Sequence, residues 1–109
     1  TKRNFVAYAT SKAALSGMTR AMSIDLGDKV RINAIEPAAI ETEMLKAGFE
    51  GAPELFEQLE QHHPRNHIGQ PDEVARLALF MVREKMDFLH GSCIGLNGGI
   101  SGRLHDPDG

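Results

Sequence analysis

The chain has 109 residues, of which 41% are hydrophobic and 25% charged, and its formal net charge is −3. This length allows one domain at most, and the balance of apolar and charged residues is that of a folded globular protein. The small negative charge argues against a nucleic-acid partner, and no apolar run reaches the roughly 20 residues that span a membrane. Because the start of the sequence also lacks the apolar segment of a secretory signal, we expect a cytoplasmic protein.

Residues 5–27 are predicted to form a helix, because apolar side chains recur at helical spacing and Gly27 can end it. The apolar stripe consists of Leu15, Met18, Met22 and Leu26. A second stripe has small side chains that let another element approach the backbone closely: Ala14, Gly17 and Ala21. This second stripe fits packing inside one subunit and contact with a second subunit equally well.

Tyr8 and Lys12 lie four residues apart in this helix and therefore share one face. A free phenol has a pKa of about 10 and gives up its proton poorly at neutral pH, whereas a cation within hydrogen-bonding range favours the phenolate form. Lys12 could in this way make Tyr8 a usable acid/base. Because tyrosine and lysine at this spacing more often decorate a solvated helix face, the pair alone does not define a site.

Residues 29–36 are predicted as a short parallel strand, which ends at Pro37 because proline has no N–H to give to a central ladder. Ligands bind beyond the carboxyl ends of such strands, so the following turn is well placed for function. Residues 41–63 place apolar and acidic side chains at helical spacing, and Pro53 can begin a second short helix. The pattern predicts a substrate lid, and a surface hairpin with an acidic face fits it equally well.

A further helix is predicted at residues 71–84, where Asp72 and Glu73 suit the positive end of the helix dipole. Residues 92–96 are predicted as a second buried strand, in which Cys93 is a buried thiol. Residues 101–109 are predicted as a loosely held tail. Alternating helices and strands indicate an α/β fold, with residues 1–109 as a segment of a single domain.

Three blocks of sequence occur together in the order and spacing of one known family. They are Tyr8-Ala-Thr-Ser-Lys12-Ala-Ala-Leu, then Arg31-Ile-Asn-Ala-Ile-Glu-Pro37-Ala-Ala-Ile-Glu-Thr42, and then Gly69-Gln-Pro-Asp-Glu-Val-Ala75 followed by Asn97-Gly-Gly99. Over nearly the whole chain up to Ser101, they resemble the C-terminal part of the short-chain dehydrogenase/reductase family in its classical, nonextended form. The resemblance implies a Rossmann-like, doubly wound parallel sheet, of which this chain would hold two strands and three to four helices.

The resemblance further implies an NAD(P)-dependent oxidoreductase, in which hydride passes between a nicotinamide cofactor, NAD or NADP, and the carbonyl or alcohol carbon of a small molecule. Tyr8 matches the family's general acid/base, and Lys12 matches the lysine that favours the phenolate and hydrogen-bonds the nicotinamide ribose. Pro37 matches the residue that shapes the turn after the strand. Ile40, through its backbone, and Thr42, through its hydroxyl, match the positions that hold the nicotinamide. The family also implies a homo-oligomer, either a dimer or a tetramer.

Two positions depart from the family's pattern. Ala38 stands where glycine is common, so the backbone there must avoid positive φ. Asn97 stands where aspartate is common, and we expect it to serve the turn and subunit contacts. The larger departure is that the sequence has neither a glycine-rich loop to cradle a pyrophosphate nor a catalytic serine upstream of Tyr8. We therefore expect the C-terminal portion of a truncated enzyme, which binds no cofactor and is inactive as a free chain.

Two other interpretations use the same sequence. The chain could be a noncatalytic assembly or dimerisation module, or a degraded remnant, whose small-residue helix and strand edge pair with a second copy or with a missing N-terminal half. A metal site at His62, His63 and His67 is disfavoured, because Pro64 interrupts the helical spacing and no acidic or cysteine ligand has a matching position. We interpret these histidines as surface residues before a turn.

Overall fold

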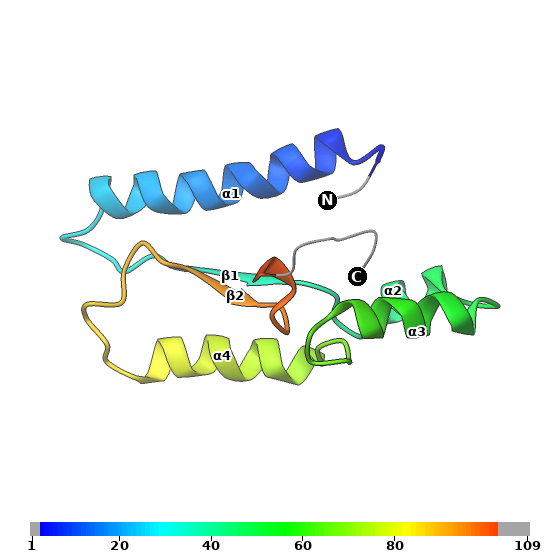
Figure 1. Ribbon diagram of the computed structural model, residues 1–109. Helices are drawn as coiled ribbons and strands as arrows, with labels where there is room; N and C mark the ends of the chain where they lie inside the picture. Colours follow the sequence, from blue (N-terminus) through cyan, green and yellow to red (C-terminus); the bar gives the residue numbers. More distant parts are fainter. Residues whose placement is uncertain (1–2, 103–109) are drawn as a thin grey trace. The chain divides into compact units, whose positions relative to one another are not determined.

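A computed structural model describes residues 3–102 of the chain. In chain order its elements are α1 (Val6–Asp25), β1 (Ala34–Pro37), α2 (Glu43–Gly48), α3 (Pro53–His62), α4 (Pro71–Arg83), β2 (Cys93–Leu96) and the 3-10 helix η1 (Ile100–Gly102) (Figure 1). The residues gather into two compact units. One contains residues up to Ile35 together with Glu84–Ile94, and the other contains Glu36–Arg83 together with residues from Gly95 onward. Of the predicted tail, residues 103–109 lie outside the described part of the chain.

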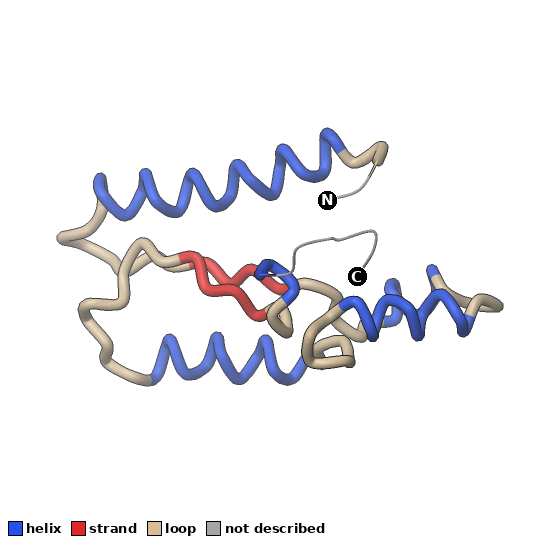
Figure 2. The backbone as a smooth tube through the Cα atoms, in the orientation of Figure 1, coloured by secondary structure: helices blue, strands red, loops and turns tan. Residues whose placement is uncertain are grey.

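The two strands pair with each other in parallel and form the sheet of the described chain (Figure 2). The N–H of Ala34 donates to the carbonyl of Ser92, and the N–H of Ala38 donates to the carbonyl of Leu96. Because both partners advance together along the chain, the register is parallel, which confirms the predicted α/β class. Within residues 3–102 each strand has only one partner, so both outer edges of the sheet are open.

The first strand is shorter than the sequence pattern suggested, since it begins at Ala34 rather than at residue 29. The N–H groups of Lys29 and Val30 both donate to the carbonyl of Leu26 and close a turn after α1. The N–H of Ile32 then donates to the imidazole Nδ1 of His90 at 3.1 Å, where a neighbouring strand would otherwise accept. A turn and a side chain therefore use the backbone donors that a longer strand would need.

Most apolar side chains of α1 are exposed within the described chain. Leu15 and Met18 are each 50% exposed, and a Cβ atom added at Gly17 would have no atom within 4 Å. Thr19 is the one buried residue of α1, and its hydroxyl donates to the carbonyl of Leu15 at 2.8 Å. The small-residue stripe therefore makes no close approach to residues 3–102 at Gly17.

The helices of the second unit begin with residues that commonly start helices. Thr42 caps α2 by accepting a hydrogen bond from the N–H of Leu45, Pro53 occupies the first turn of α3, and Asp72 and Glu73 occupy the first turn of α4. Asn97 closes the turn after β2, since its side-chain oxygen accepts from the N–H of Gly99 and its amide donates to the hydroxyl of Ser101. This is the turn role expected at that position.

His63 differs from the surface histidine that the sequence suggested, because only 2% of it is exposed. The residue follows the last turn of α3, and its ring folds back so that Nδ1 lies 2.8 Å from the carbonyl oxygen of Leu59. A helix end leaves its last carbonyls without backbone donors, and the imidazole N–H satisfies one of them. The interpretation of His63 as a surface residue is therefore wrong.

Candidate active site

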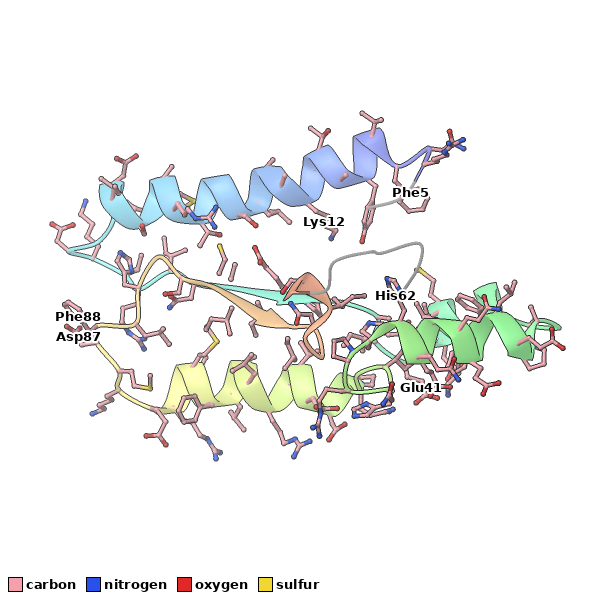
Figure 3. All side chains as sticks on the ribbon, in the orientation of Figure 1. Phe5, Lys12, Glu41, His62, Asp87 and Phe88 are labelled. Carbon is pink, nitrogen blue, oxygen red and sulfur yellow. The ribbon has the colours of Figure 1, made fainter. Side chains whose placement is uncertain are left out.

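Tyr8 and Lys12 come together on one face of α1, as their spacing requires. The ammonium nitrogen of Lys12 lies 5.5 Å from the centroid of the Tyr8 ring, so the cation stands over the ring. Phe5 packs its ring against Tyr8 in an edge-to-face arrangement, with centroids 5.6 Å apart and planes at 73° (Figure 3 labels Phe5 and Lys12). Tyr8 as a whole residue remains 58% exposed.

The turn that follows β1 carries the other predicted site residues, and these belong to the second unit. Pro37 is the last residue of β1. Among the described residues, only Asn4 and Asn66 combine a side chain with positive φ, so Ala38 occupies this turn without left-handed strain. Replacing glycine by alanine at this position therefore leaves an ordinary backbone.

The hydrogen bonds of this turn leave the backbone N–H of Ile40 unused. It forms an isolated parallel bridge with Gly69, in which the N–H of Gly69 donates to the carbonyl of Ala39 and the N–H of Glu41 donates to the carbonyl of Gly69. The carbonyl of Ile40 itself accepts from the N–H of Thr42. Within residues 3–102, no group accepts a hydrogen bond from the N–H of Ile40, so that donor is available to a ligand.

Thr42 keeps a donor of its own while it caps α2. Its hydroxyl oxygen accepts from the N–H of Leu45 at 3.2 Å, and the hydroxyl hydrogen is not needed for that bond. The two cofactor positions that the resemblance gave to Ile40 and Thr42 therefore carry a backbone donor and a side-chain donor two residues apart. Such a pair can donate to an acceptor oxygen, such as that of a carboxamide.

The segment predicted as a lid forms α2 and α3, which enclose an aromatic contact. The rings of Phe49 and Phe56 meet edge to face with centroids 5.7 Å apart. They line an open cleft of about 350 Å³, beside which Lys46 and Glu41 form an ion pair at 3.8 Å. Met44 is 86% exposed on α2.

Sequence reasoning missed the residues that hold the Ile40 turn in place. Gln70 donates to the Glu41 carboxylate at 2.6 Å, and Gly69 packs so closely that an added Cβ would lie 2.6 Å from the Cδ1 atom of Ile40. A glycine two residues before the predicted helix start at Pro71 was the available signal for a close backbone approach. Within residues 3–102, no group of three histidine, cysteine or acidic side chains is arranged to hold a metal ion.

Comparisons of sequence with known proteins give consistent matches. The model of the family described as enoyl-(acyl carrier protein) reductase matches residues 1–101. The 7alpha-hydroxysteroid dehydrogenase of Escherichia coli (strain K12) is 39% identical over 97 residues, which are 88% of this chain and 37% of that protein. Short-chain dehydrogenase anuF of Penicillium roqueforti is 33% identical over 99 residues, which are 90% of this chain and 36% of that protein. The chain thus spans little more than a third of these relatives.

Solved structures agree with the sequence matches. Ligand-free aldohexose dehydrogenase of Thermoplasma acidophilum superposes with a TM-score of 0.87 and 30% identity, covering 98% of this chain and 46% of that one. A structure of ElxO with NADP bound superposes with a TM-score of 0.79 and 27% identity, covering 88% of this chain and 39% of that one. None of the described helices is long and apolar enough to cross a membrane.

Proposed function

This chain belongs to the short-chain dehydrogenase/reductase family, as its three sequence blocks predicted, and we propose that it supplies the tyrosine and lysine of an NAD(P)-dependent oxidoreductase. The observation that carries the proposal is the Lys12 ammonium 5.5 Å from the centroid of the Tyr8 ring, beside an exposed phenol. The substrate is a small molecule with a carbonyl or alcohol group. The cytoplasmic location stays a prediction.

In this proposal Tyr8 moves a proton and Lys12 supports the charge that the transfer leaves behind. When bound, the nicotinamide cofactor supplies the hydride that reduces a carbonyl carbon, or takes it in the reverse direction. As the substrate oxygen gains negative charge, the Tyr8 hydroxyl donates its proton to that oxygen and becomes a phenolate. The Lys12 cation stabilises the phenolate electrostatically, which lowers the barrier to proton transfer.

We assign to the turn after β1 the role of holding the nicotinamide. The free N–H of Ile40 and the hydroxyl of Thr42 would donate to the carboxamide end of the cofactor, while Pro37 fixes the turn. The pyrophosphate would need a glycine-rich loop at a helix N-terminus, which these 109 residues do not contain. Activity is therefore proposed for a longer chain that includes this segment, and the 109 residues alone are expected to be inactive.

The cleft between α2 and α3 supports a substrate with an apolar part. The rings of Phe49 and Phe56 line one part of the cleft, and the ion pair of Lys46 with Glu41 makes another part polar. Aromatic walls bury apolar ligand surface, and charged groups at the rim orient polar substituents. The family contains dehydrogenases named for steroids and for aldohexoses, so the family alone does not select the substrate.

Assembly is a second candidate function, and the exposure of α1 favours it. Leu15 and Met18 are each 50% exposed within residues 3–102, a Cβ atom added at Gly17 would meet no atom within 4 Å, and the sheet has open edges. Open edges and apolar helix faces are ordinarily covered by a second chain or by further parts of the same chain. A homo-oligomer, dimer or tetramer, would use such a surface and is compatible with catalysis.

Replacing Lys12 by methionine tests the oxidoreductase proposal. We expect kcat/KM for carbonyl reduction by the full-length protein to fall by about a hundredfold or more, because the phenolate loses its cation. The decay of reduced nicotinamide absorbance measures the rate. Lys29→Met makes the same change in a turn where, within residues 3–102, Lys29 forms its hydrogen bond through the backbone alone, and it should leave the rate unchanged. Equal rates in the two variants would remove Lys12 from the mechanism.

Replacing Thr42 by valine tests the cofactor role. Losing one hydrogen bond from the hydroxyl should raise the cofactor KM about five- to tenfold, with a smaller effect on kcat. Thr42→Ser retains both the cap of α2 and the hydroxyl donor and should restore the cofactor KM. If serine and valine variants show the same cofactor KM, the hydroxyl does not bind the nicotinamide.

A further inference from the structure

The turn that carries the unused N–H of Ile40 is held from one side by the segment that leads into α4. Ile68 of that segment is only 3% exposed, which fixes the segment in the second unit. The next residue, Gly69, donates to the carbonyl of Ala39 at 2.9 Å and accepts from the N–H of Glu41 at 2.8 Å. Because backbone groups of successive residues in an extended chain point to alternate sides, the N–H of Ile40 points away from Gly69.

Gln70 stands directly before α4, at a position where a capping side chain is ordinarily found. Serine, threonine, aspartate and asparagine are preferred there, because their side chains accept a hydrogen bond from the first turn of the helix. Here the Glu73 carboxylate accepts from the N–H of Gln70 at 3.2 Å, and the N–H of Glu73 donates to the carbonyl of Gln70 at 3.0 Å. The helix therefore fixes the backbone of Gln70, and the side chain is left for another partner.

That partner is the carboxylate of Glu41, the residue between the two proposed nicotinamide donors (Figure 3 labels Glu41). The side-chain amide of Gln70 donates to one carboxylate oxygen at 2.6 Å, and the ammonium of Lys46 lies 3.8 Å from the other. Hydrogen bonds to a carboxylate are roughly twice as strong as those between neutral groups, whereas a half-exposed ion pair at the longer distance contributes little. Gln70 is therefore the main partner of Glu41.

We propose that Glu41 and Gln70 are positioning residues that direct the donors of this turn toward the nicotinamide. The inference rests on the proposed role of Ile40 and Thr42 in holding the cofactor. Glu41 lies between these two residues, so a bond at its side chain restricts the backbone on both sides. Without that bond the turn keeps its backbone bonds to Gly69, but the two donors are less often directed at one acceptor. Lost preorganisation of this kind lowers affinity without removing any contact to the ligand.

Replacing Gln70 by methionine in the full-length protein tests the inference. Methionine keeps the side-chain length but has no donor for the Glu41 carboxylate. The dissociation constant for NADH or NADPH, whichever binds more tightly, is measured by nicotinamide fluorescence and should rise about three- to tenfold. That for ADP-ribose, the cofactor without its nicotinamide, is measured by calorimetry and should change less than about twofold. Gln61→Met is the matched control, since it removes a bond from Gln61 to Glu57 on α3 and should change neither affinity.

A conservative variant and a double variant distinguish positioning from a general effect on folding. Gln70→Lys supplies another donor to the Glu41 carboxylate and should return the affinity for the reduced cofactor to within about twofold of the original. Glu41→Ala should weaken this affinity at least as much as Gln70→Met does. Adding Gln70→Met to Glu41→Ala should cause no further loss, because the bond needs both partners.

Three results would overturn the inference. These are an unchanged affinity for the reduced cofactor in Gln70→Met, an equal loss of affinity for ADP-ribose, and a further loss in the double variant. Thr42→Val distinguishes such a failure from a failure of the proposed function. If Thr42→Val weakens the reduced cofactor and Gln70→Met does not, the turn binds the nicotinamide without help from Gln70. If neither variant weakens it, the cofactor role of the turn is wrong as well.

Discussion

Replacing Tyr8 by phenylalanine is expected to lower kcat by about a thousandfold or more, while the affinity for the nicotinamide cofactor stays within about twofold. The substitution removes only the hydroxyl group. The remaining ring keeps its edge-to-face contact with Phe5 and its position beneath the Lys12 cation, so α1 should fold as before. A loss of rate would then report the missing proton donor rather than a displaced helix.

The experiment needs two readouts on the full-length protein. Steady-state reduction of a carbonyl substrate gives kcat, and quenching or enhancement of the reduced nicotinamide's fluorescence gives the cofactor affinity. Phe5→Leu serves as the control, because it removes the aromatic contact to Tyr8 and keeps the phenol. We expect it to retain most of the activity. A Tyr8→Phe variant with near-normal kcat would remove Tyr8 as the acid/base and, with it, the proposed mechanism.

The parts of the fold that followed from the sequence depend on local periodicity. The spacing of Tyr8 and Lys12 fixes their common face on any helix, and the cation over the ring follows from that geometry. Pro37, Pro53 and Pro71 are equally local signals, because a missing N–H limits where each residue can stand in a strand or helix. Caps such as Thr42 belong to the same class.

The parts that did not follow depend on contacts between residues far apart in the chain. The bridge of Ile40 with Gly69 frees one backbone donor for a ligand, but neither residue type indicates that pairing. The burial of His63 was not predictable from the residues around it, because it depends on two contacts of the folded chain. Its ring satisfies a carbonyl one helical turn earlier, and the turn after β2 packs over it. A histidine beside a proline fits an exposed turn and a buried cap equally well, and only the surrounding structure distinguishes them.

His90 is the clearest case of a residue that sequence patterns overlooked. Its Nε2 lies 2.7 Å from the carbonyl oxygen of Ser23 near the end of α1, and its Nδ1 accepts from the N–H of Ile32 at 3.1 Å. The carbonyl fixes hydrogen on Nε2, and the N–H requires a bare Nδ1, so the neutral ring connects both segments. Space around it is tight, since a Cβ added at Gly27 would lie 2.7 Å from the Ser23 oxygen and 3.2 Å from the His90 ring.

Replacing His90 by alanine is therefore expected to destabilise the protein by about 2–4 kcal/mol, because one carbonyl and one N–H lose their partners in a half-buried site. Urea unfolding of the full-length protein measures the change in the free energy of unfolding. His67→Ala is the control, because His67 is exposed and its ring has one hydrogen bond within residues 3–102, to the neighbouring carbonyl of Ile68; its cost should stay below about 0.5 kcal/mol.

Amide hydrogen exchange separates this bond from a general packing loss. In the His90→Ala variant the amide of Ile32 should exchange much faster relative to the amides of α4, which lie in the other unit. Loss of packing alone would speed exchange throughout the first unit without singling out Ile32. If Ile32 keeps its protection, His90 does not hold the end of α1, the helix that carries Tyr8 and Lys12, to the segment that leads into β1.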